Sequence, residues 1–481
     1  MNFETIIGLE VHAQLLTKSK MFCCCSADYA SAPPNTHVCP VCLGLPGVLP
    51  VINRQAIEFT IMTALALNCS VAEFTKFDRK NYPYPDLMKG YQVSQYDSPV
   101  ARHGWLSIDV DGETKRVGIT RVHLEEDVAK LQHCASFTET YSLVDVNRSG
   151  VPLMEIVGEP DLRSPEEARQ YLVKLRSILQ YLGVSTGNME EGSFRCDANI
   201  SIRPEDNPRP LAKVEVKNMN SFKAVYQALE YEARRQRQVA SEGERLVQET
   251  RGWVEEKGQT VSQRSKEYAH DYRYFPEPDL PPLSVSREWV EKITASLPEL
   301  PETRRDRFIA EYGLRQYDAN LLTGSRLMAD YFEETARDGR VAAKEVSNWL
   351  LGEVSRILNE KGIGVAEFRA RIPPERLAEL IASAHDVINI SVAKDVLDEM
   401  FDSGKTASRI IDERGLSQIS DTGEIAAAIE KAIAENPKPV ADYKNGKAQA
   451  LTFLVGQVMK ATRGRANARI VNDLIKKRLS E

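Results

Sequence analysis

Up to about residue 287, the chain contains short stretches in which apolar and polar residues alternate. Alternation places the two kinds of side chain on opposite faces of a strand, as in antiparallel sheets with one face in water. We therefore expect strands at Ile6–Ala13, Leu106–Val110, Lys115–Thr120, Asp197–Ile202 and Ala212–Val216. These stretches predict that the first part of the chain is rich in sheet.

Helices are expected between these strands. Ser164 offers an N-cap, Pro165 suits the first helical position, and Glu167 stands two residues further on. This signal predicts a helix that runs to about Leu182. A longer, charged helix is expected over Phe222–Glu242.

Prolines separate this part from a helical remainder. The four prolines from Pro276 to Pro282 predict a rigid, extended exit from the first domain. Beyond them the pattern is almost wholly helical, and Pro437 and Pro439 interrupt it. We expect an α+β fold with an antiparallel-sheet domain at residues 1–293, a helical domain at 294–404 and a small helical tail domain at 405–481.

The length of 481 residues exceeds what one hydrophobic core usually organises. Apolar content of 42% and charged content of 27% are typical of a globular protein in water. The first residues lack the basic start and apolar run of a signal peptide, and no run approaches the roughly 20 apolar residues of a transmembrane helix. We therefore expect a cytoplasmic protein without a membrane partner.

The net charge of −7 is unevenly distributed. Residues 436–481 carry ten Lys or Arg and three Asp or Glu, so this end is +7 and the rest of the chain is −14. A basic end on an acidic protein indicates a polyanionic partner such as RNA. The alternative is a solvated helix face, and composition alone does not separate the two.

Five of the eight cysteines lie between Cys23 and Cys42. Thiolates bind zinc tetrahedrally, and closely spaced pairs supply two ligands from one tight turn. The spacing favours a structural zinc site whose ligands would be Cys23, Cys25, Cys39 and Cys42. Cys24 would then be the spare thiol, and His37 is a possible substitute ligand. Unliganded thiols are the main alternative. A redox role is less favoured because no thioredoxin-like context surrounds the motif.

Acidic residues and one histidine recur between apolar residues on several expected strands. Glu10 and His12 are two apart, so they share a strand face. Similar positions are held by Glu125, Glu155, Asp197 and Glu215. Several acids on one face repel one another unless cations neutralise them, and oxygen ligands with an imidazole suit Mg²⁺ or Mn²⁺. For each residue alone a surface salt bridge is the simpler interpretation, whereas the set favours a metal site that holds a nucleoside triphosphate.

Two segments, residues 78–86 and 271–276, combine cations, aromatic residues and prolines. Aromatic rings and guanidinium groups stack on unpaired bases, and Lys and Arg bind phosphates. The alternative is that the tyrosines and prolines pack at a domain edge. Both interpretations stay open at this point.

Together the motifs resemble one family, the B subunits of the aspartyl/glutamyl-tRNA(Asn/Gln) amidotransferases. The resemblance covers essentially the whole chain. It is carried by long and unusual strings: Ile7–His12, Cys39–Gly47, Lys76–Tyr82, His123–Asp127, Glu190–Asn199, Asp271–Asp279 and Asp442–Lys447.

The resemblance implies an enzyme that works as one part of a three-chain complex, with an amidase-type glutaminase and a small bridging chain as the other two. The glutaminase would supply ammonia, and this chain would bind a misacylated tRNA, with the cognate synthetase as a further partner. ATP would phosphorylate the side-chain carboxylate of Asp-tRNA(Asn) or Glu-tRNA(Gln), and ammonia would then displace the phosphate. The alternative is a non-catalytic tRNA-binding member of the same complex.

The resemblance also implies roles for parts of the chain. The first domain would be the catalytic one and similar in fold to glutamine synthetase and guanido kinases, and the tail would bind tRNA. The magnesium ligands would be Glu10, His12, Glu125, Glu155, Asp197 and Glu215. Contacts to phosphate would come from Arg79, Lys80 and Arg195. Contacts to tRNA would come from Tyr82, Arg273, Lys444, Lys447, Lys460 and Arg463.

The cysteine motif departs from the family in one respect. The common Cys-Gly-Cys of the family is Cys23-Cys24-Cys25 here, which leaves the choice of ligands among these three slightly open. Some members of the family lack the site. The zinc would therefore hold the fold and take no part in the chemistry.

Overall fold

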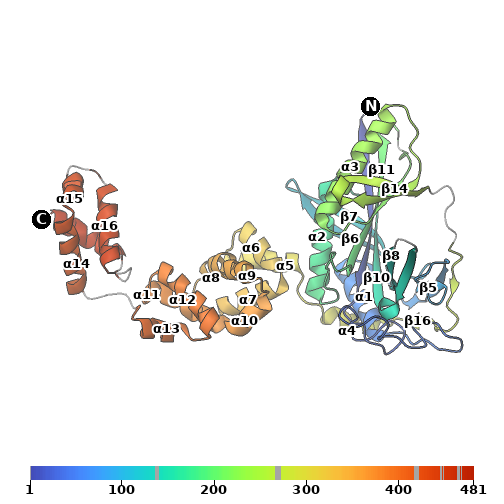
Figure 1. Ribbon diagram of the computed structural model, residues 1–481, viewed down its shortest axis with the longest axis horizontal. Helices are drawn as coiled ribbons and strands as arrows, with labels where there is room; N and C mark the ends of the chain where they lie inside the picture. Colours follow the sequence, from blue (N-terminus) through green and yellow to red (C-terminus); the bar gives the residue numbers. More distant parts are fainter. Residues whose placement is uncertain are drawn as a thin grey trace. The chain divides into compact units, whose positions relative to one another are not determined.

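The structure is a computed structural model that describes residues 2–135, 140–207, 209–265, 272–337, 339–416, 422–444, 447, 449–462, 466 and 468–480. The chain divides into two compact units, Met1–Pro301 and Glu302–Glu481. The first unit is rich in sheet and the second is helical (Figure 1). The expectation of a sheet-rich first part and a helical remainder is confirmed.

A nine-stranded sheet is the framework of the first unit. Its strands lie in the order β14 (Gln259–Ser265), β13 (Glu249–Val254), β12 (Val214–Lys217), β11 (Phe194–Pro204), β1 (Phe3–Gln14), β10 (Pro152–Gly158), β7 (Glu113–Glu126), β6 (Ala101–Val110) and β2 (Ser70–Val71). The five expected strands correspond to β1, β6, β7, β11 and β12, with shifted ends. Strand β1 lies at the centre of this order, where it pairs with β11 on one side and β10 on the other.

Helical crossovers make the sheet less uniformly antiparallel than expected. Strands β12 and β13 pair in parallel, because α3 (Phe222–Ser241) carries the chain from one to the other. Helix α2 (Pro165–Leu182) likewise joins β10 to β11, and β1 lies between these two strands. A connection through a helix brings the chain back to the same end of the sheet, so the joined strands run in the same direction.

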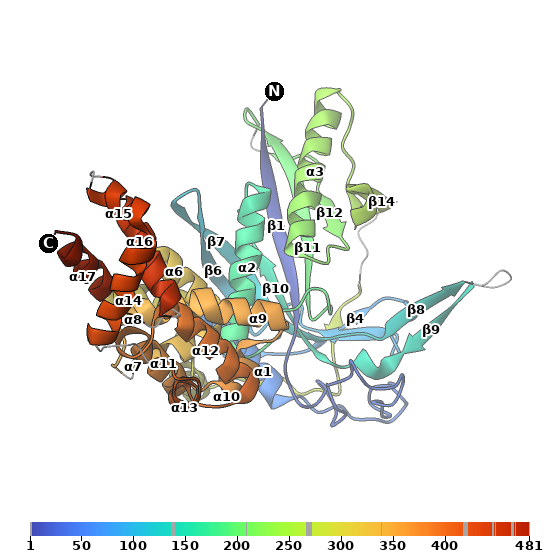
Figure 2. The same cartoon turned by 60° about the vertical axis from the view of Figure 1, so that its left-hand side comes forward.

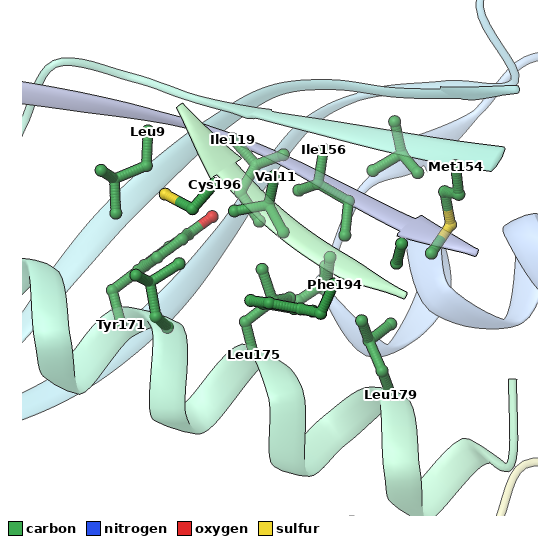
Figure 3. Packing of buried hydrophobic residues seen from close by; sticks show 14 of the residues in the cluster. Leu9, Val11, Ile119, Met154, Ile156, Tyr171, Leu175, Leu179, Phe194 and Cys196 are labelled. Atoms are coloured by element: carbon green, nitrogen blue, oxygen red, sulfur yellow. The ribbon is translucent and has the colours of Figure 1, made fainter. Parts of the chain in front are cut away.

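The expected start of α2 is confirmed. The Ser164 hydroxyl accepts a hydrogen bond from the Glu167 backbone N–H at 3.1 Å, and Gly183 ends the helix in a left-handed conformation. Helices α2 and α3 cover one face of the sheet (Figure 2). Tyr171 and Leu175 of α2 pack against Val11 and other apolar residues of the strands (Figure 3). The apolar side of each alternating strand faces these helices, which leaves the polar side on the opposite face.

Shorter elements surround the polar face. A three-stranded sheet joins β15 (Phe275–Pro276), β4 (Asp78–Asn81) and β5 (Tyr91–Ser94), and β16 (Leu283–Ser284) pairs with β3 (Phe74–Thr75). Strands β8 (Lys130–Ala135) and β9 (Thr140–Asp145) form a hairpin that projects from the unit (Figure 2). The remaining elements of this unit are α1 (Arg54–Ala66), α4 (Arg287–Ala295) and the short 3₁₀ helices η1 (Val146–Arg148) and η2 (Glu255–Lys257).

The second unit is built from helices around two hydrophobic clusters. The first cluster involves α5 (Pro301–Tyr312), α6 (Gln316–Thr323), α7 (Arg326–Arg337), α8 (Ala343–Trp349), the π-helical stretch η3 (Leu350–Val354), α9 (Ser355–Lys361), α10 (Val365–Arg371), α11 (Pro374–Asp386), α12 (Ile390–Ser403) and α13 (Ala407–Arg414). The second involves α14 (Thr422–Glu435), α15 (Pro437–Lys444), α16 (Gln449–Ala461) and α17 (Ala468–Ser480). The division into three domains stays a prediction.

The helical pattern is interrupted as expected beside the prolines near the C-terminus, since α14 ends at Glu435 and α15 begins at Pro437. Pro437 and Pro439 lie in the first turn of α15. Proline fits there because the first backbone N–H groups of a helix have no partner within the helix.

Among the described residues, no helix is long and apolar enough to cross a membrane.

Candidate functional site

A row of polar side chains crosses the centre of the sheet on its open face. Strand pairing places His12 of β1 opposite Glu155 of β10, and Glu155 opposite His123 of β7. On the other side, His12 lies opposite Arg195 of β11. Residues opposite one another on neighbouring strands point to the same face, so all four side chains meet there.

His12 and Glu155 come close to Glu125, and His123 lies beside them. The His12 Nε2 atom lies 3.5 Å from a Glu125 oxygen and 3.4 Å from a Glu155 oxygen. The His123 Nε2 atom lies 3.2 Å from the same Glu155 oxygen. Ligand atoms of His12, Glu125 and Glu155 all lie within 4.8 Å of one another, and both carboxylates are buried. We call these three residues the central cluster.

The charges in the central cluster depend on one another. Burial opposes a charge on His12, but Glu155 and Glu125 together raise its pKa to about 9. Burial also opposes a charge on Glu155, but His123 and His12 hold its pKa well below its ordinary value. In the metal-free protein a proton on the imidazole therefore balances the acids. A divalent cation could replace that proton, since two carboxylates and an imidazole are suitable ligands for Mg²⁺ or Mn²⁺.

The small sheet beside the cluster contributes Lys80 and Ser94. The Ser94 hydroxyl donates a hydrogen bond to Glu125 at 3.2 Å. The Lys80 ammonium lies 5.0 Å from the centre of the Tyr272 ring. Burial disfavours its charge, but Glu125 and other nearby groups keep the pKa of Lys80 above its ordinary value. A fixed cation thus faces the acidic cluster.

The other three predicted magnesium ligands are arranged differently. Lys217 lies between two of them, with its ammonium bound to Asp197 and 3.1 Å from Glu215. Glu10 accepts a hydrogen bond of 2.7 Å from the Asn199 amide. The structure therefore divides the six predicted ligands into the central cluster and a second set that contains its own lysine.

Of the predicted phosphate contacts, the structure brings Lys80 and Arg195 to the site. Arg195 binds Asp127 at 3.0 Å, and its side chain stays 37% exposed, so part of its guanidinium is accessible. Arg79 instead makes two hydrogen bonds of 2.7 Å to Glu277. This bidentate pair occupies the guanidinium away from the central cluster.

The cysteine group has the geometry of a tetrathiolate site. The Cys42 sulfur lies 3.4 Å from that of Cys23 and 3.7 Å from that of Cys39, and Cys25 completes a group within 4.8 Å. Four thiolates about 2.3 Å from a zinc ion would stand about 3.8 Å apart, so the residues fit this ion. Cys24 is exposed and stands outside the group. We call the four residues the cysteine clip.

A buried lysine stands against the cysteine clip. The Lys20 side chain is fully buried, and its ammonium lies 2.7 Å from the His37 carbonyl oxygen and 3.6 Å from the Cys42 sulfur. A hydrogen bond from Cys23 and the charge of Lys20 lower the pKa of Cys42. The surroundings therefore favour a thiolate at Cys42, whereas the hydrogen bond to Cys42 raises the pKa of Cys23 and burial raises that of Cys25. The thiolate is the form that binds a metal.

The predicted tRNA contacts lie in both units. Tyr82 packs edge-to-face on Tyr272 beside the central cluster, and Arg273 is exposed. Lys447 is exposed and 3.0 Å from Asp442, and Lys460 is exposed near the end of α16. The side chain of Lys444 and the whole of Arg463 lie outside the described residues.

Sequence reasoning did not select several residues that complete these groups. His123 has an apolar neighbour on each side, which gave no signal beyond that of a buried strand. Lys217 follows Glu215 with the spacing of one strand face, and this alternation could have suggested a neutralising role. Asp127 and Lys20 gave no local signal, because their partners are distant along the sequence.

Comparisons with known proteins give a consistent result along the chain. Residues 5–291 match the family described as the GatB/GatE catalytic domain, and residues 330–479 match the family described as the GatB domain. These matches leave residues 292–329 between them.

Relatives also match over their full length. The chain is 60% identical over 488 residues to the B subunit of the aspartyl/glutamyl-tRNA(Asn/Gln) amidotransferase of Dehalococcoides mccartyi, a match that covers 100% of this chain and 99% of that protein. Identity to the protein of the same name is 56% over 481 residues in Carboxydothermus hydrogenoformans and 56% over 480 residues in Moorella thermoacetica. Those matches cover 100% of this chain, and 99% and 100% of the two proteins. The comparisons confirm the resemblance carried by the sequence motifs.

Proposed function

Because the chain belongs to the family with the GatB/GatE catalytic domain, we propose that it is the B subunit of an aspartyl/glutamyl-tRNA amidotransferase. It activates the side-chain carboxylate of Asp or Glu esterified to tRNA with ATP. It then converts the activated group to the amide with ammonia from a glutaminase partner. The products are Asn-tRNA(Asn) or Gln-tRNA(Gln), ADP and phosphate.

The observation that carries this proposal is the central cluster. His12, Glu125 and Glu155 converge from three strands, and Lys80 stands beside them. The donor set fits a divalent cation, and we propose that these residues hold Mg²⁺ or Mn²⁺. When bound, the cation supplies positive charge that offsets the negative charge of the ATP phosphates.

The chain's own cations fit the chemistry of the activation step. A substrate carboxylate oxygen attacks the γ-phosphorus, and the bond to the leaving ADP oxygen breaks. Lys80 and the exposed part of Arg195 are suited to bind the phosphate oxygens during this transfer. Ammonia then attacks the acyl carbon, and inorganic phosphate leaves with the bonding electrons. Arg79, which is held by Glu277, is more suited to fixing the small sheet.

The second acidic set is proposed to support the same reaction. Glu10, Asp197 and Glu215 lie on β1, β11 and β12, which follow one another across the sheet. Lys217 neutralises two of these acids in the absence of a ligand. A further cation could bind there if the lysine turned toward an incoming phosphate.

The cysteine clip is proposed to hold structural zinc. All four protein ligands would be used, which leaves no open position for a substrate. The clip fixes the loop of residues 20–42 against the rest of the unit. In this proposal the zinc stabilises the fold and the central cluster performs the chemistry.

Several further assignments rest on the family. We propose that the partners are an amidase-type glutaminase chain, a small bridging chain and misacylated tRNA, with the cognate synthetase as a further partner in the cytoplasm. The sheet-rich unit is proposed to have a fold like that of glutamine synthetase and guanido kinases, and the last helices are proposed to bind tRNA. Lys447 and Lys460 are exposed and suited to contact phosphates there.

The decisive experiment uses Glu125→Ala in the complex reconstituted with its partner chains. Transamidation of Asp-tRNA(Asn) and Glu-tRNA(Gln) should fall by a factor of about 1,000 or more, while tRNA binding and glutaminase activity persist. Glu113→Ala on the same strand is the control, because Glu113 is exposed. Normal transamidation by the Glu125 variant would instead favour a non-catalytic, tRNA-binding role in the complex.

A further inference from the structure

Two tyrosines form an exposed stack at the edge of the central cluster. The rings of Tyr96 and Tyr274 are 4.3 Å apart, and their planes differ by 11°. Tyr96 is 61% exposed, whereas Tyr274 is half-buried. The partner ring covers one face of Tyr96, so much of its exposed surface is available to a further planar group.

A row of rings leads from this stack to the cluster. The Tyr274 ring centre lies 6.1 Å from that of Tyr272, which in turn stands 5.0 Å from the Lys80 ammonium. Burial raises the pKa of Tyr274 to about 12, and the charges of Glu125 and Glu155 add to this rise. The stack is therefore close enough for one ligand to contact Tyr96 and also reach the acids.

The backbone around Tyr96 is fixed on both sides. The Gln95 side chain accepts a hydrogen bond of 3.0 Å from the Leu124 backbone and donates one of 2.6 Å to Thr75. Asp97 on the other side pairs with Lys76 at 2.8 Å. Tyr96 itself thus sits between two anchored neighbours, although the residue is largely exposed. An exposed ring on a fixed backbone is already arranged for binding.

The other half of the stack is fixed as well. The Asn81 backbone N–H binds the Tyr272 carbonyl oxygen at 2.9 Å, and the Asn81 amide binds the Arg273 carbonyl oxygen at 2.9 Å. Arg273 has a φ of 45°, a conformation that a residue with a side chain adopts only where its surroundings hold it there. Such conformations often occur at binding sites.

We propose that Tyr96 and Tyr274 form a stacking subsite for the adenine ring of a ligand whose reacting end enters the central cluster. This inference rests on the proposed function, which brings two adenine rings to the site: that of ATP and that of the 3′-terminal adenosine of the tRNA. Adenine presents a flat π-face that adds to the stack as a third ring. Lys80 and the central cluster then lie on the side of the phosphate or the esterified amino acid.

The test compares Tyr96→Ala with Tyr96→Phe in the reconstituted complex, and Tyr141→Ala is the control. Tyr141 is similarly exposed, at 52%, but lies on the β8–β9 hairpin. Loss of one stacked base should raise a KM on the order of tenfold in Tyr96→Ala. The phenylalanine variant keeps the ring and should stay near the wild type, as should the control.

Separate measurements identify which adenine is bound. If it belongs to ATP, the KM for ATP rises and that for aminoacyl-tRNA does not. If it belongs to the tRNA, the KM for aminoacyl-tRNA rises. When the 3′-terminal nucleotide of the tRNA lacks its base, Tyr96→Ala and the wild type should then have the same KM for it. An unchanged KM for both substrates, or an equal effect of Tyr96→Phe, would overturn the subsite.

Direct binding keeps this inference separate from the proposed function. The full chain is titrated at equilibrium with ATP and, separately, with a short RNA ending in adenosine. Tyr96→Ala should weaken binding of the probe whose adenine occupies the subsite. A wild-type complex that binds either probe through Tyr96 but does not transamidate would contradict the proposed function alone. If Tyr96→Ala weakened neither probe, the subsite would be excluded even in an active complex.

Discussion

The cysteine clip and the central cluster both bring metal-binding side chains together, but they are assembled in opposite ways. The four cysteines come from one loop, residues 23–42, so residues close along the chain supply all of them. His12, Glu125 and Glu155 come from three separate strands and meet only when the sheet forms. The clip is a local structure, whereas the cluster is a product of the whole fold.

The two groups also differ in how their charges are balanced. Lys20 is buried against a sulfur of the clip, so this thiolate group has its own cation within the fold. In the central cluster, two buried carboxylates share a proton on His12 in the absence of a metal. The two carboxylates repel one another, but the raised pKa of His12 and the lowered pKa of Glu155 show that the imidazoles offset this repulsion. We conclude that the cation of the clip is a fixed part of the fold, whereas the cluster balances its acids with a proton that a metal ion could replace.

The largest expected effect separates chemistry from stability at Glu155. Replacing Glu155 with Gln removes a charge and keeps the shape, so kcat should fall by about 1,000-fold or more. The thermal midpoint near neutral pH should fall by only a few degrees, because the pairing of Glu155 with His12 and His123 is lost but one of two crowded carboxylates is also removed. Single-turnover kinetics and calorimetry would measure the two effects. Glu113→Gln on the exposed end of β7 serves as the control.

A different outcome would change the comparison. If Glu155→Gln lowered the thermal midpoint by many degrees and lost activity only in proportion to folded protein, the cluster would be a structural ion-pair group. His123 and His12 would then hold Glu155 for stability, as Lys20 supports the clip. The cluster and the clip would in that case serve the same purpose.

The second prediction concerns the clip. Cys42→Ser removes a buried ligand, so bound zinc should be lost and the thermal midpoint should fall by about 5 °C or more. Activity per folded molecule at low temperature should remain within about tenfold of the wild type, because the clip leaves no position for a substrate. Cys24→Ser is the matched control, and it should retain zinc because Cys24 lies outside the group. Loss of zinc from that control would mean that the ligand set differs.

A third prediction concerns the lysine beside the clip. Lys20→Met replaces the buried lysine with an apolar side chain of similar length and so removes the positive charge. A chelator should then remove zinc about 10- to 100-fold more readily than from the wild type. Retention would be measured per folded molecule with a zinc-sensitive dye. Lys18→Met, two residues away on the surface, should behave as the wild type. Equal retention in both variants would show that the clip needs no neighbouring cation.

This contrast explains what the sequence could predict. The clip and the start of α2 at Ser164 depend on residues close along the chain, so spacing revealed them. Alternation pointed to the acids, but it could not show that the Lys217 ammonium binds Asp197 on the neighbouring strand. Such neighbours lie on different strands, and their proximity depends on strand order and register.

Short elements with distant partners were also missed. Strand β15 has only two residues, and it forms because Phe275 pairs with Arg79, far away along the chain. No periodicity can develop over so short a stretch. The parallel pairing of β12 and β13 was missed for a related reason, since a sequence pattern does not fix strand direction.

The last prediction asks whether the clip and the central cluster are connected. The Asn147 side chain accepts a hydrogen bond of 2.8 Å from the backbone N–H of His37 in the cysteine loop. The next residue, Arg148, lies 3.6 Å from Asp127, which binds Arg195 at 3.0 Å. This series of contacts joins the loop to a proposed phosphate-binding group.

Asp127→Asn should therefore raise the KM for ATP by about three- to tenfold, with a smaller effect on kcat. Asparagine has nearly the same shape, but it offers Arg195 no charge, so the guanidinium is held less firmly. Asp111→Asn is the control, because this exposed turn residue has a φ of 53°, which asparagine tolerates. If Cys42→Ser at low temperature shows the same change in KM, the clip positions Arg195 through Asp127. If only Asp127→Asn shows it, the clip stabilises its loop without influence on the chemistry, and the two metal-binding groups are independent.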